Sequence, residues 1–222
     1  MNPILAARSD FSVGESILTI DKLVSGAKAI GASVVGLTDT MSVTALIDFS
    51  NAAKKAELRP IIGCRLRLTD DPTWRPAKGE KKKHMPREYF LTVYPRNDAG
   101  MKTVFRLLTL ANSEQRFYYV AKIGFDDFFA ELTDDLVVVL GDGASVLEHP
   151  DVENIAKRCC KQSKHVYAPL VPINTPYWGR VNQIAAGLCA TTRVLPIVIR
   201  TALYEKDGAD VQEIMTAISD ND

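Results

Sequence analysis

The chain has 222 residues, of which 46% are hydrophobic, so it is long enough to bury one substantial core. Its 27 lysines and arginines balance its 27 aspartates and glutamates, so any contact with nucleic acid needs a local basic patch. The apolar runs are strand-length, which excludes a transmembrane helix, and the N-terminal one is too short for a signal peptide. The four cysteines show no C-x-x-C pairing, so we expect reduced thiols in a cytoplasmic protein.

The first part of the chain alternates short apolar runs with amphipathic segments. Strands are predicted over 4–7, 34–37 and 59–68, with helices over 21–30 and 43–56 between them. In the first helix, Leu23, Val24 and Ala27 recur at helical spacing. Residues 70–88 hold three prolines and a cluster of charge, so we expect an exposed loop insertion there.

The second part continues the alternation of strands and helices. Strands are predicted over 89–94, 136–140, 166–170 and 196–199. Helices are predicted over 99–111, 125–131, 152–161, 179–191 and 211–218. Because strands joined by helices form parallel sheets, the pattern predicts an α/β fold, closed into a barrel or left open. No boundary is stronger than the 70–88 loop, so we expect one domain over 1–222.

The segment 34–68, VVGLTDTMSVTALIDFSNAAKKAELRPIIGCRLRL, has the size of one βαβ unit. It resembles the second and third strands of a PHP (polymerase and histidinol phosphatase) domain, the module at the N-terminus of bacterial DNA polymerase III alpha subunits. The resemblance extends over nearly the whole chain, including Asn97-x-x-Gly100 and the run Leu195-Pro196-Ile197-Val198. It implies an α/β fold of the PHP superfamily, a distorted (β/α)7-type TIM-like barrel.

In that family the strand ends carry a polynuclear metal site, and the resemblance places its ligand positions on this chain. Most of them hold residues that do not bind metal, although Glu15 and Asp142 keep carboxylates suited to a hard metal. Two lone carboxylates do not make a polynuclear site. The positions are Ala6, Arg8, Glu15, Asp39, Thr40, Arg65, Phe90, Asp142, Ala202 and Tyr204.

Arg8 and Arg65 stand where the family binds metal cations. At about 4 Å and an effective dielectric near 20, each would repel a unit metal charge by about 4 kcal/mol. We therefore expect no metal, no cofactor and no catalytic residue. The arginines could instead pair with Glu15, Asp39 or Asp142. Since family sites lie where strands end, Arg8 and Arg65 are predicted to converge at the C-terminal mouth of the barrel.

The resemblance implies a catalytically inactive PHP-like domain, a pseudoenzyme related to the replicative DNA polymerase III alpha subunit. It would act as a structural or partner-docking module in DNA replication, with the polymerase body or a proofreading exonuclease as partner and no membrane contact. We do not expect the isolated chain to be an enzyme. The alternative is a metal-dependent phosphoesterase or 3′-5′ exonuclease with a rearranged site at Glu15, Asp39, Asp48 and Asp142.

A basic cluster beside a tryptophan supports a third hypothesis, a DNA-binding accessory that uses the loop over 74–87. The aromatic ring would stack on a base while the cations contact phosphates weakly. A solvated charged loop is the more common role of such a run. The residues of this hypothesis are Trp74, Lys81, Lys82, Lys83 and Arg87.

Overall fold

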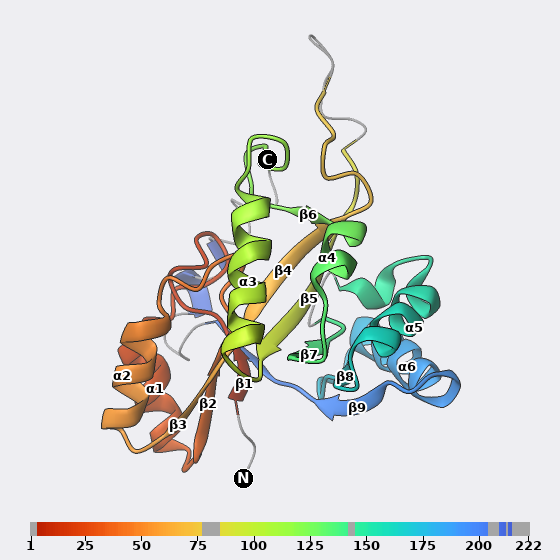
Figure 1. Cartoon of the computed structure of the whole chain (residues 1–222). Helices are drawn as coiled ribbons and strands as arrows, with labels where there is room; N and C mark the ends of the chain where they lie inside the picture. Colours follow the sequence, from red (N-terminus) through yellow and green to blue (C-terminus); the bar gives the residue numbers. More distant parts are fainter. Residues whose placement is uncertain (1–3, 77–84, 142–144, 204–208, 212, 215–222) are drawn as a thin grey trace. The chain divides into compact units, whose positions relative to one another are not determined.

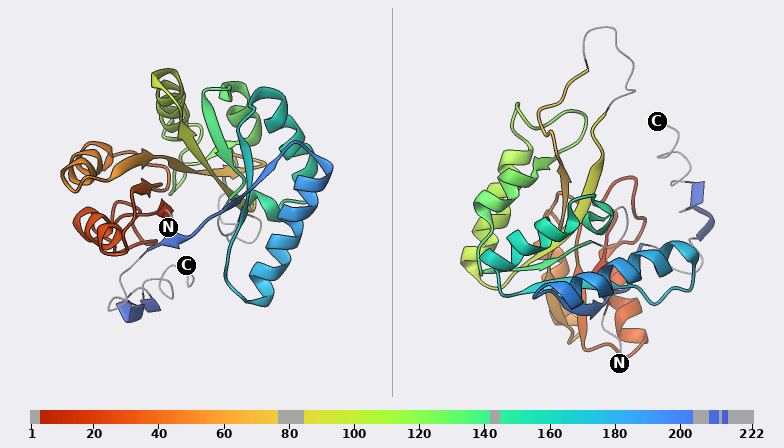
Figure 2. Two further views of the ribbon diagram at one scale, coloured as in Figure 1. Left: turned by 90° about the horizontal axis from the view of Figure 1, so that it is seen from below. Right: turned by 90° about the vertical axis from the view of Figure 1, so that its right-hand side faces the viewer.

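The computed structural model describes residues 4–76, 85–141, 145–203, 209–211 and 213–214. The chain divides into two compact units. Unit 1 comprises Met1–Cys64 and Ile199–Asp222, and unit 2 comprises Arg65–Val198. Each unit contains one sheet with helices packed against it (Figures 1 and 2).

Unit 1 is built on a four-stranded parallel sheet in the order β10-β1-β2-β3. Helices α1 and α2 lie side by side against it (Figure 1). Leu23 of α1 and Phe49 of α2 pack with Val35 of β2 in a fully buried core. The elements are β1 (Ile4–Ala7), α1 (Ile20–Ala29), β2 (Val34–Leu37), α2 (Leu46–Lys55), β3 (Arg59–Ile62) and β10 (Thr201–Ala202).

Local chemistry explains where these elements begin and how closely they pack. Thr19 starts α1, because its side chain accepts a hydrogen bond from the amide of Lys22. Gly31 follows the helix with φ +69°, a left-handed conformation that suits glycine. At Gly36 a Cβ atom would lie 2.5 Å from the carbonyl oxygen of Leu5, so only glycine lets β1 and β2 approach this closely.

Unit 2 is built on a six-stranded sheet in the order β6-β4-β5-β7-β8-β9. Helices α3, α4, α5 and α6 lie along one face of it (Figure 2). The strands are β4 (Cys64–Thr69), β5 (Glu88–Pro95), β6 (Ile123–Gly124), β7 (Leu136–Val139), β8 (Val166–Leu170) and β9 (Leu195–Val198). The helices are α3 (Asp98–Ala111), α4 (Phe125–Glu131), η1 (Val146–Glu148), α5 (Val152–Gln162) and α6 (Pro176–Thr191).

Two details of the predicted strands were wrong. The run over 59–68 forms two strands in different sheets, separated by Gly63, whose amide donates to the carbonyl of Leu37 at 2.8 Å. In unit 2, β5 and β7 are antiparallel, with Thr92 opposite Val139, so the sheet is not purely parallel. The helix after β5 leads to β6, not to β7, so no βαβ crossover obliges β5 and β7 to run in the same direction.

Within the part of the chain that the structure describes, no helix is long and apolar enough to cross a membrane. The described parts of the expected loop, 70–76 and 85–87, contain neither helix nor strand.

Candidate functional site

A buried polar cluster in unit 1 forms where β1 and β2 end. The carboxylate of Asp39 is 1% exposed and accepts three hydrogen bonds of 2.7 Å each. They come from the amide and the hydroxyl of Ser9 and from the hydroxyl of Ser12. The Ser12 oxygen in turn accepts from the amide of Thr40 at 3.1 Å. Asp39 thus connects the loop after β1 to the end of β2. Its carboxylate oxygens accept hydrogen bonds from the two serines, whereas a metal ligand would need these oxygens to face the metal.

Arg8 and Glu15 form an ion pair in the same loop. Arg8 Nε lies 3.2 Å from Glu15 Oε2, and the Thr40 hydroxyl donates to the same oxygen at 2.7 Å. Arg8 is only 8% exposed, so its charge requires a nearby anion. Of the anions that the sequence offers as partners, the structure brings Glu15 to Arg8.

Two alanines occupy further positions of unit 1 where the sequence resemblance predicts ligands. Ala6 lies buried on β1, and Ala202 pairs with Ala7 across the parallel β1–β10 ladder. The carbonyl of Ala202 accepts a hydrogen bond from the amide of Arg8 at 3.0 Å. These positions therefore contribute backbone contacts and packing. Tyr204, predicted at the neighbouring position, lies outside the described residues.

Cys64 is fully buried in unit 1. Burial, aided by the negative charge of Asp39, raises the pKa of its thiol to about 12, against the lowering effect of backbone hydrogen bonds at Ser42 and Met41. The thiol is therefore neutral at physiological pH. A neutral buried thiol is neither a nucleophile nor a metal ligand, which agrees with a structural role.

In unit 2, two of the predicted ligand positions contact each other. The guanidinium carbon of Arg65 lies 3.5 Å from the ring centroid of Phe90, and Arg65 is 6% exposed. Arg67, two residues along β4, lies 5.4 Å from the same centroid and pairs with Glu88 at 3.5 Å. A desolvated arginine stacked on an aromatic ring contributes about 2 kcal/mol. A cation–π pair thus occupies two positions where the resemblance predicts a glutamate and a histidine ligand.

Of the carboxylates of the alternative enzyme hypothesis, Glu15 and Asp39 lie in the polar cluster of unit 1. Asp48 is exposed in the first turn of α2, and Asp142 lies outside the described residues. In the described part of the chain, no group of three or more histidine, cysteine, aspartate or glutamate side chains is arranged to hold a metal ion. Arg8 belongs to unit 1 and Arg65 to unit 2, and their convergence stays a prediction.

Of the residues in the DNA-binding hypothesis, the structure describes Trp74 and Arg87. Trp74 packs edge-on against Tyr118, with ring centroids 6.3 Å apart. Arg87 lies 3.4 Å from a carboxylate oxygen of Glu148. Lys81, Lys82 and Lys83 lie outside the described residues, so a DNA contact by this loop stays a prediction.

A buried cation close to this loop was not predicted from the sequence. Lys122 is 2% exposed, and burial lowers the pKa of its ammonium group, partly offset by the charge of Glu88. The nearby Arg75 anchors the loop by donating to the carbonyl oxygens of Glu114, Gln115 and Phe117. Neither role had a signal in the local sequence, because both depend on residues far apart in the chain meeting in space.

The sequence also matches known proteins. Residues 5–168 match the PHP domain family. The DNA polymerase III subunit alpha of Yersinia pestis is 29% identical over 98% of this chain, and the one of Escherichia coli K12 is 27% identical over 97%. The matched regions make up 19% and 18% of those proteins, so the chain spans about a fifth of the length of these relatives.

Two solved structures share the fold. A putative metal-dependent phosphoesterase from Bifidobacterium adolescentis aligns with a TM-score of 0.55 and 10% identity over 96% of both chains. An amidohydrolase from Chromobacterium violaceum aligns with a TM-score of 0.61 and 8% identity over 97% of both chains. At such identities the likeness concerns the fold alone, and it confirms the predicted α/β fold of TIM-like barrel type. With the family match over most of its length, the chain belongs to the PHP domain family.

Proposed function

We propose that this chain is a non-catalytic PHP domain that serves as a structural or partner-docking module in DNA replication, beside a polymerase of the DNA polymerase III alpha type. The observation that carries the proposal is that the carboxylates at the family's ligand positions interact with side chains and amides of the protein itself. Asp39 accepts three hydrogen bonds from serines, and Glu15 faces the guanidinium of Arg8.

The residues present do not fit the metals that the fold family implies. A polynuclear site needs several histidines and carboxylates to neutralise and orient its cations. In unit 1 the corresponding side chains are Ala6, a buried arginine and a threonine, beside two carboxylates that already have partners. To bind both carboxylates, a metal ion would have to displace the Arg8 guanidinium from Glu15 and also break the hydrogen bonds of Asp39.

The contacts in unit 2 support the same proposal. Arg65 and Phe90 stack on each other, so neither has the donor atoms or the space for a metal. The relatives that match along the chain are polymerase subunits, which supports a replication setting. The chain covers about a fifth of them, so a polymerase activity of the whole relatives is not proposed for it.

The loss of catalysis is tested with metal binding and hydrolysis assays. We expect purified protein, stripped with EDTA and then offered Mn²⁺ or Zn²⁺, to retain no stoichiometric metal by mass spectrometry. It should also hydrolyse neither 4-nitrophenyl phosphate nor end-labelled single-stranded DNA. Metal-dependent turnover that is lost in Asp39→Asn but kept in the exposed control Asp21→Asn would overturn the proposal.

The docking role is tested by co-elution. The chain is mixed with a DNA polymerase III alpha subunit lacking its own PHP domain, or with the proofreading exonuclease, and the mixture is analysed by size exclusion with light scattering. We expect a stable complex with one of the two. Separate elution of all components at concentrations well above micromolar would remove the docking role and leave the metal result unaffected.

A further inference from the structure

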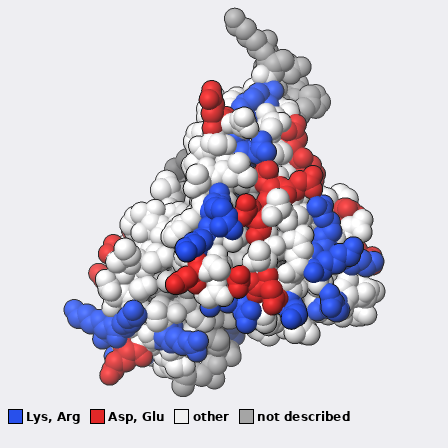
Figure 3. Space-filling view, viewed as in Figure 1, with Lys and Arg blue, Asp and Glu red and all other residues white. Residues whose placement is uncertain are grey.

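An open cavity of about 520 Å³ lies on unit 2, lined by α5 and by the end of α6 with the turn that follows it. Although the whole chain is neutral, this lining contains four cations and no acidic residue. Figure 3 shows lysine and arginine side chains gathered over this part of the surface. The cations are Lys157, Arg158, Lys161 and Arg193.

Two of these four cations, Lys157 and Arg158, form ion pairs within the protein, and both pairs are exposed to solvent. Lys157 pairs with Glu153 at 2.7 Å, an exposed i,i+4 pair of the kind that contributes only about 0.3–0.5 kcal/mol and is easily exchanged. Arg158 is held by Asp126 at 3.1 Å and lies over the ring of Phe129. Lys161 has no acidic partner within ion-pair distance among the described residues.

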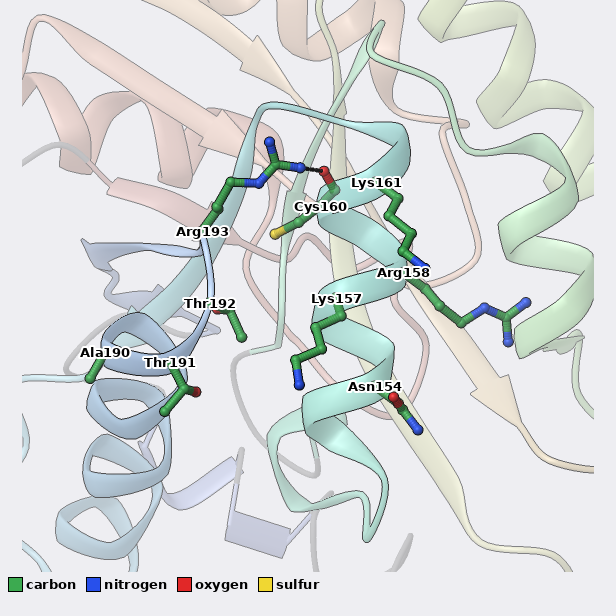
Figure 4. A pocket seen from close by; sticks show the side chains of 9 residues that line it. All are labelled: Asn154, Lys157, Arg158, Cys160, Lys161, Ala190, Thr191, Thr192 and Arg193. Atoms are coloured by element: carbon green, nitrogen blue, oxygen red, sulfur yellow. Dashed lines mark hydrogen bonds between the residues drawn. The ribbon is translucent and has the colours of Figure 1, made fainter.

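The shape of the cavity is set by rigid elements. Figure 4 shows Lys157 extending into the gap between α5 and α6, with Thr191 and Thr192 on the opposite side. Arg193 donates a hydrogen bond to the carbonyl of Cys160, which fixes its guanidinium across the gap (Figure 4). Three of the cations stand on α5, and Arg193 is held by its hydrogen bond, so the backbone positions of these charges are fixed before an anion binds. Arg158 and Lys161 extend from the side of α5 that faces away from α6, at the rim of the cavity (Figure 4).

We propose that this cavity, the α5–α6 cleft, binds the phosphodiester backbone of DNA. Its donors are charged or hydroxyl-bearing groups suited to phosphate oxygens. The lining has no aromatic ring on which a base could stack, so the cleft would hold the backbone without reading sequence. It also lacks the aromatic or large aliphatic anchor that the centre of a protein interface needs, which disfavours an acidic peptide.

The test is a fluorescence anisotropy titration of a labelled oligonucleotide with the whole chain over a series of salt concentrations. The variant is Lys157→Gln/Lys161→Gln, and the matched control is Lys54→Gln/Lys55→Gln in the last turn of α2, where both lysines are exposed. We expect about tenfold weaker binding at low salt for the variant, and a slope of log K against log salt that is smaller by about two. The control should bind like the unmodified protein, and both variants should melt like it.

Three outcomes would overturn the inference. Equal losses in the variant and the control would mean that only overall charge matters. Competition by polyglutamate as effective as that by unlabelled DNA would assign the cleft to an acidic protein segment. Inorganic phosphate could also compete as effectively as the oligonucleotide at the same phosphate concentration. That result would show that the cleft binds small anions and not a DNA backbone. None of these results depends on the metal or docking experiments, so the inference and the proposed function can fail separately.

Discussion

At the scale of single residues, the stability of unit 1 depends on whether each buried carboxylate has a hydrogen-bond donor or a cation as partner. Asp39 is almost fully buried and faces three donors, and Glu15 faces a buried guanidinium and a hydroxyl. In an emptied metal site, neighbouring carboxylates would repel each other. Here each carboxylate has its own positive or hydrogen-bonding partner, so removing a charge should weaken the fold.

Replacing Asp39 by asparagine tests this idea. The asparagine NH₂ group would replace one carboxylate oxygen and so face a serine hydroxyl that now donates to that oxygen. We therefore expect the free energy of unfolding in urea to fall by about 3 kcal/mol. The control Asp21→Asn, exposed in the first turn of α1, should change it by less than about 1 kcal/mol. A stabilised Asp39→Asn variant would indicate carboxylate repulsion and argue for a vacated metal site.

The buried thiols predict a loss of stability at alkaline pH. The pKa values of Cys64 and Cys159 are raised by burial from 9.0 to about 12, so between these values the native state keeps protons that the unfolded chain loses. The free energy of unfolding therefore falls as pH rises above about 9, with each thiol contributing a slope of about 1.4 kcal/mol per pH unit.

Urea titrations at about pH 8 and about pH 10 measure this slope. We expect Cys64→Ala to lower stability at the lower pH, because it leaves a small cavity, but to flatten the alkaline decline. An unchanged decline in Cys64→Ala would show that this thiol does not contribute to it.

At the scale of elements, short motifs have a local physical reason. In Asn97-x-x-Gly100, the Asn97 side chain accepts from the amide of Gly100 at 3.0 Å and starts α3. The glycine is needed because a Cβ atom there would lie 2.4 Å from the carbonyl oxygen of Asp135. One motif thus combines a helix cap with a close approach between α3 and the turn before β7.

Gly100→Ala is expected to destabilise the protein by about 1–3 kcal/mol, since the obstructing atom belongs to the backbone and cannot swing away. The matched control is Gly187→Ala within α6, where no atom lies within 4 Å of the added Cβ. The control should be stabilised by about 0.5–1 kcal/mol through helix propensity. Thermal and urea unfolding of the two variants decide the matter, and equal effects would refute the steric argument.

At the scale of the whole molecule, a metal that binds only the folded state raises the stability of the protein, wherever its site lies. A metal at 100 times its Kd would add about 2.7 kcal/mol to stability. For a chain of this size that amounts to a Tm increase of about 5–10 °C. We expect Mn²⁺ to leave the unfolding temperature within about 1 °C of the value in EDTA. A rise of several degrees that Asp39→Asn abolishes would contradict this prediction.

The sequence by itself determined the family, and it predicts substitutions at the family's ligand positions. Runs such as Leu37-Thr38-Asp39 and Leu195-Pro196-Ile197-Val198 are local, and the resemblance predicts that Arg8 and Arg65 stand at ligand positions. Helix caps and apolar spacing are also local, which is why most predicted elements lie near the observed ones.

Only the tertiary structure decided which contacts the residues at the predicted ligand positions make. Arg8 meets Glu15 and Thr40, and Arg65 stacks on Phe90 across neighbouring strands. The antiparallel pairing of β5 with β7 and the basic α5–α6 cleft were likewise invisible in the sequence. Periodicity records which face of an element is buried, but not which distant side chains share that space, because those contacts are set by the packing of segments far apart in the chain.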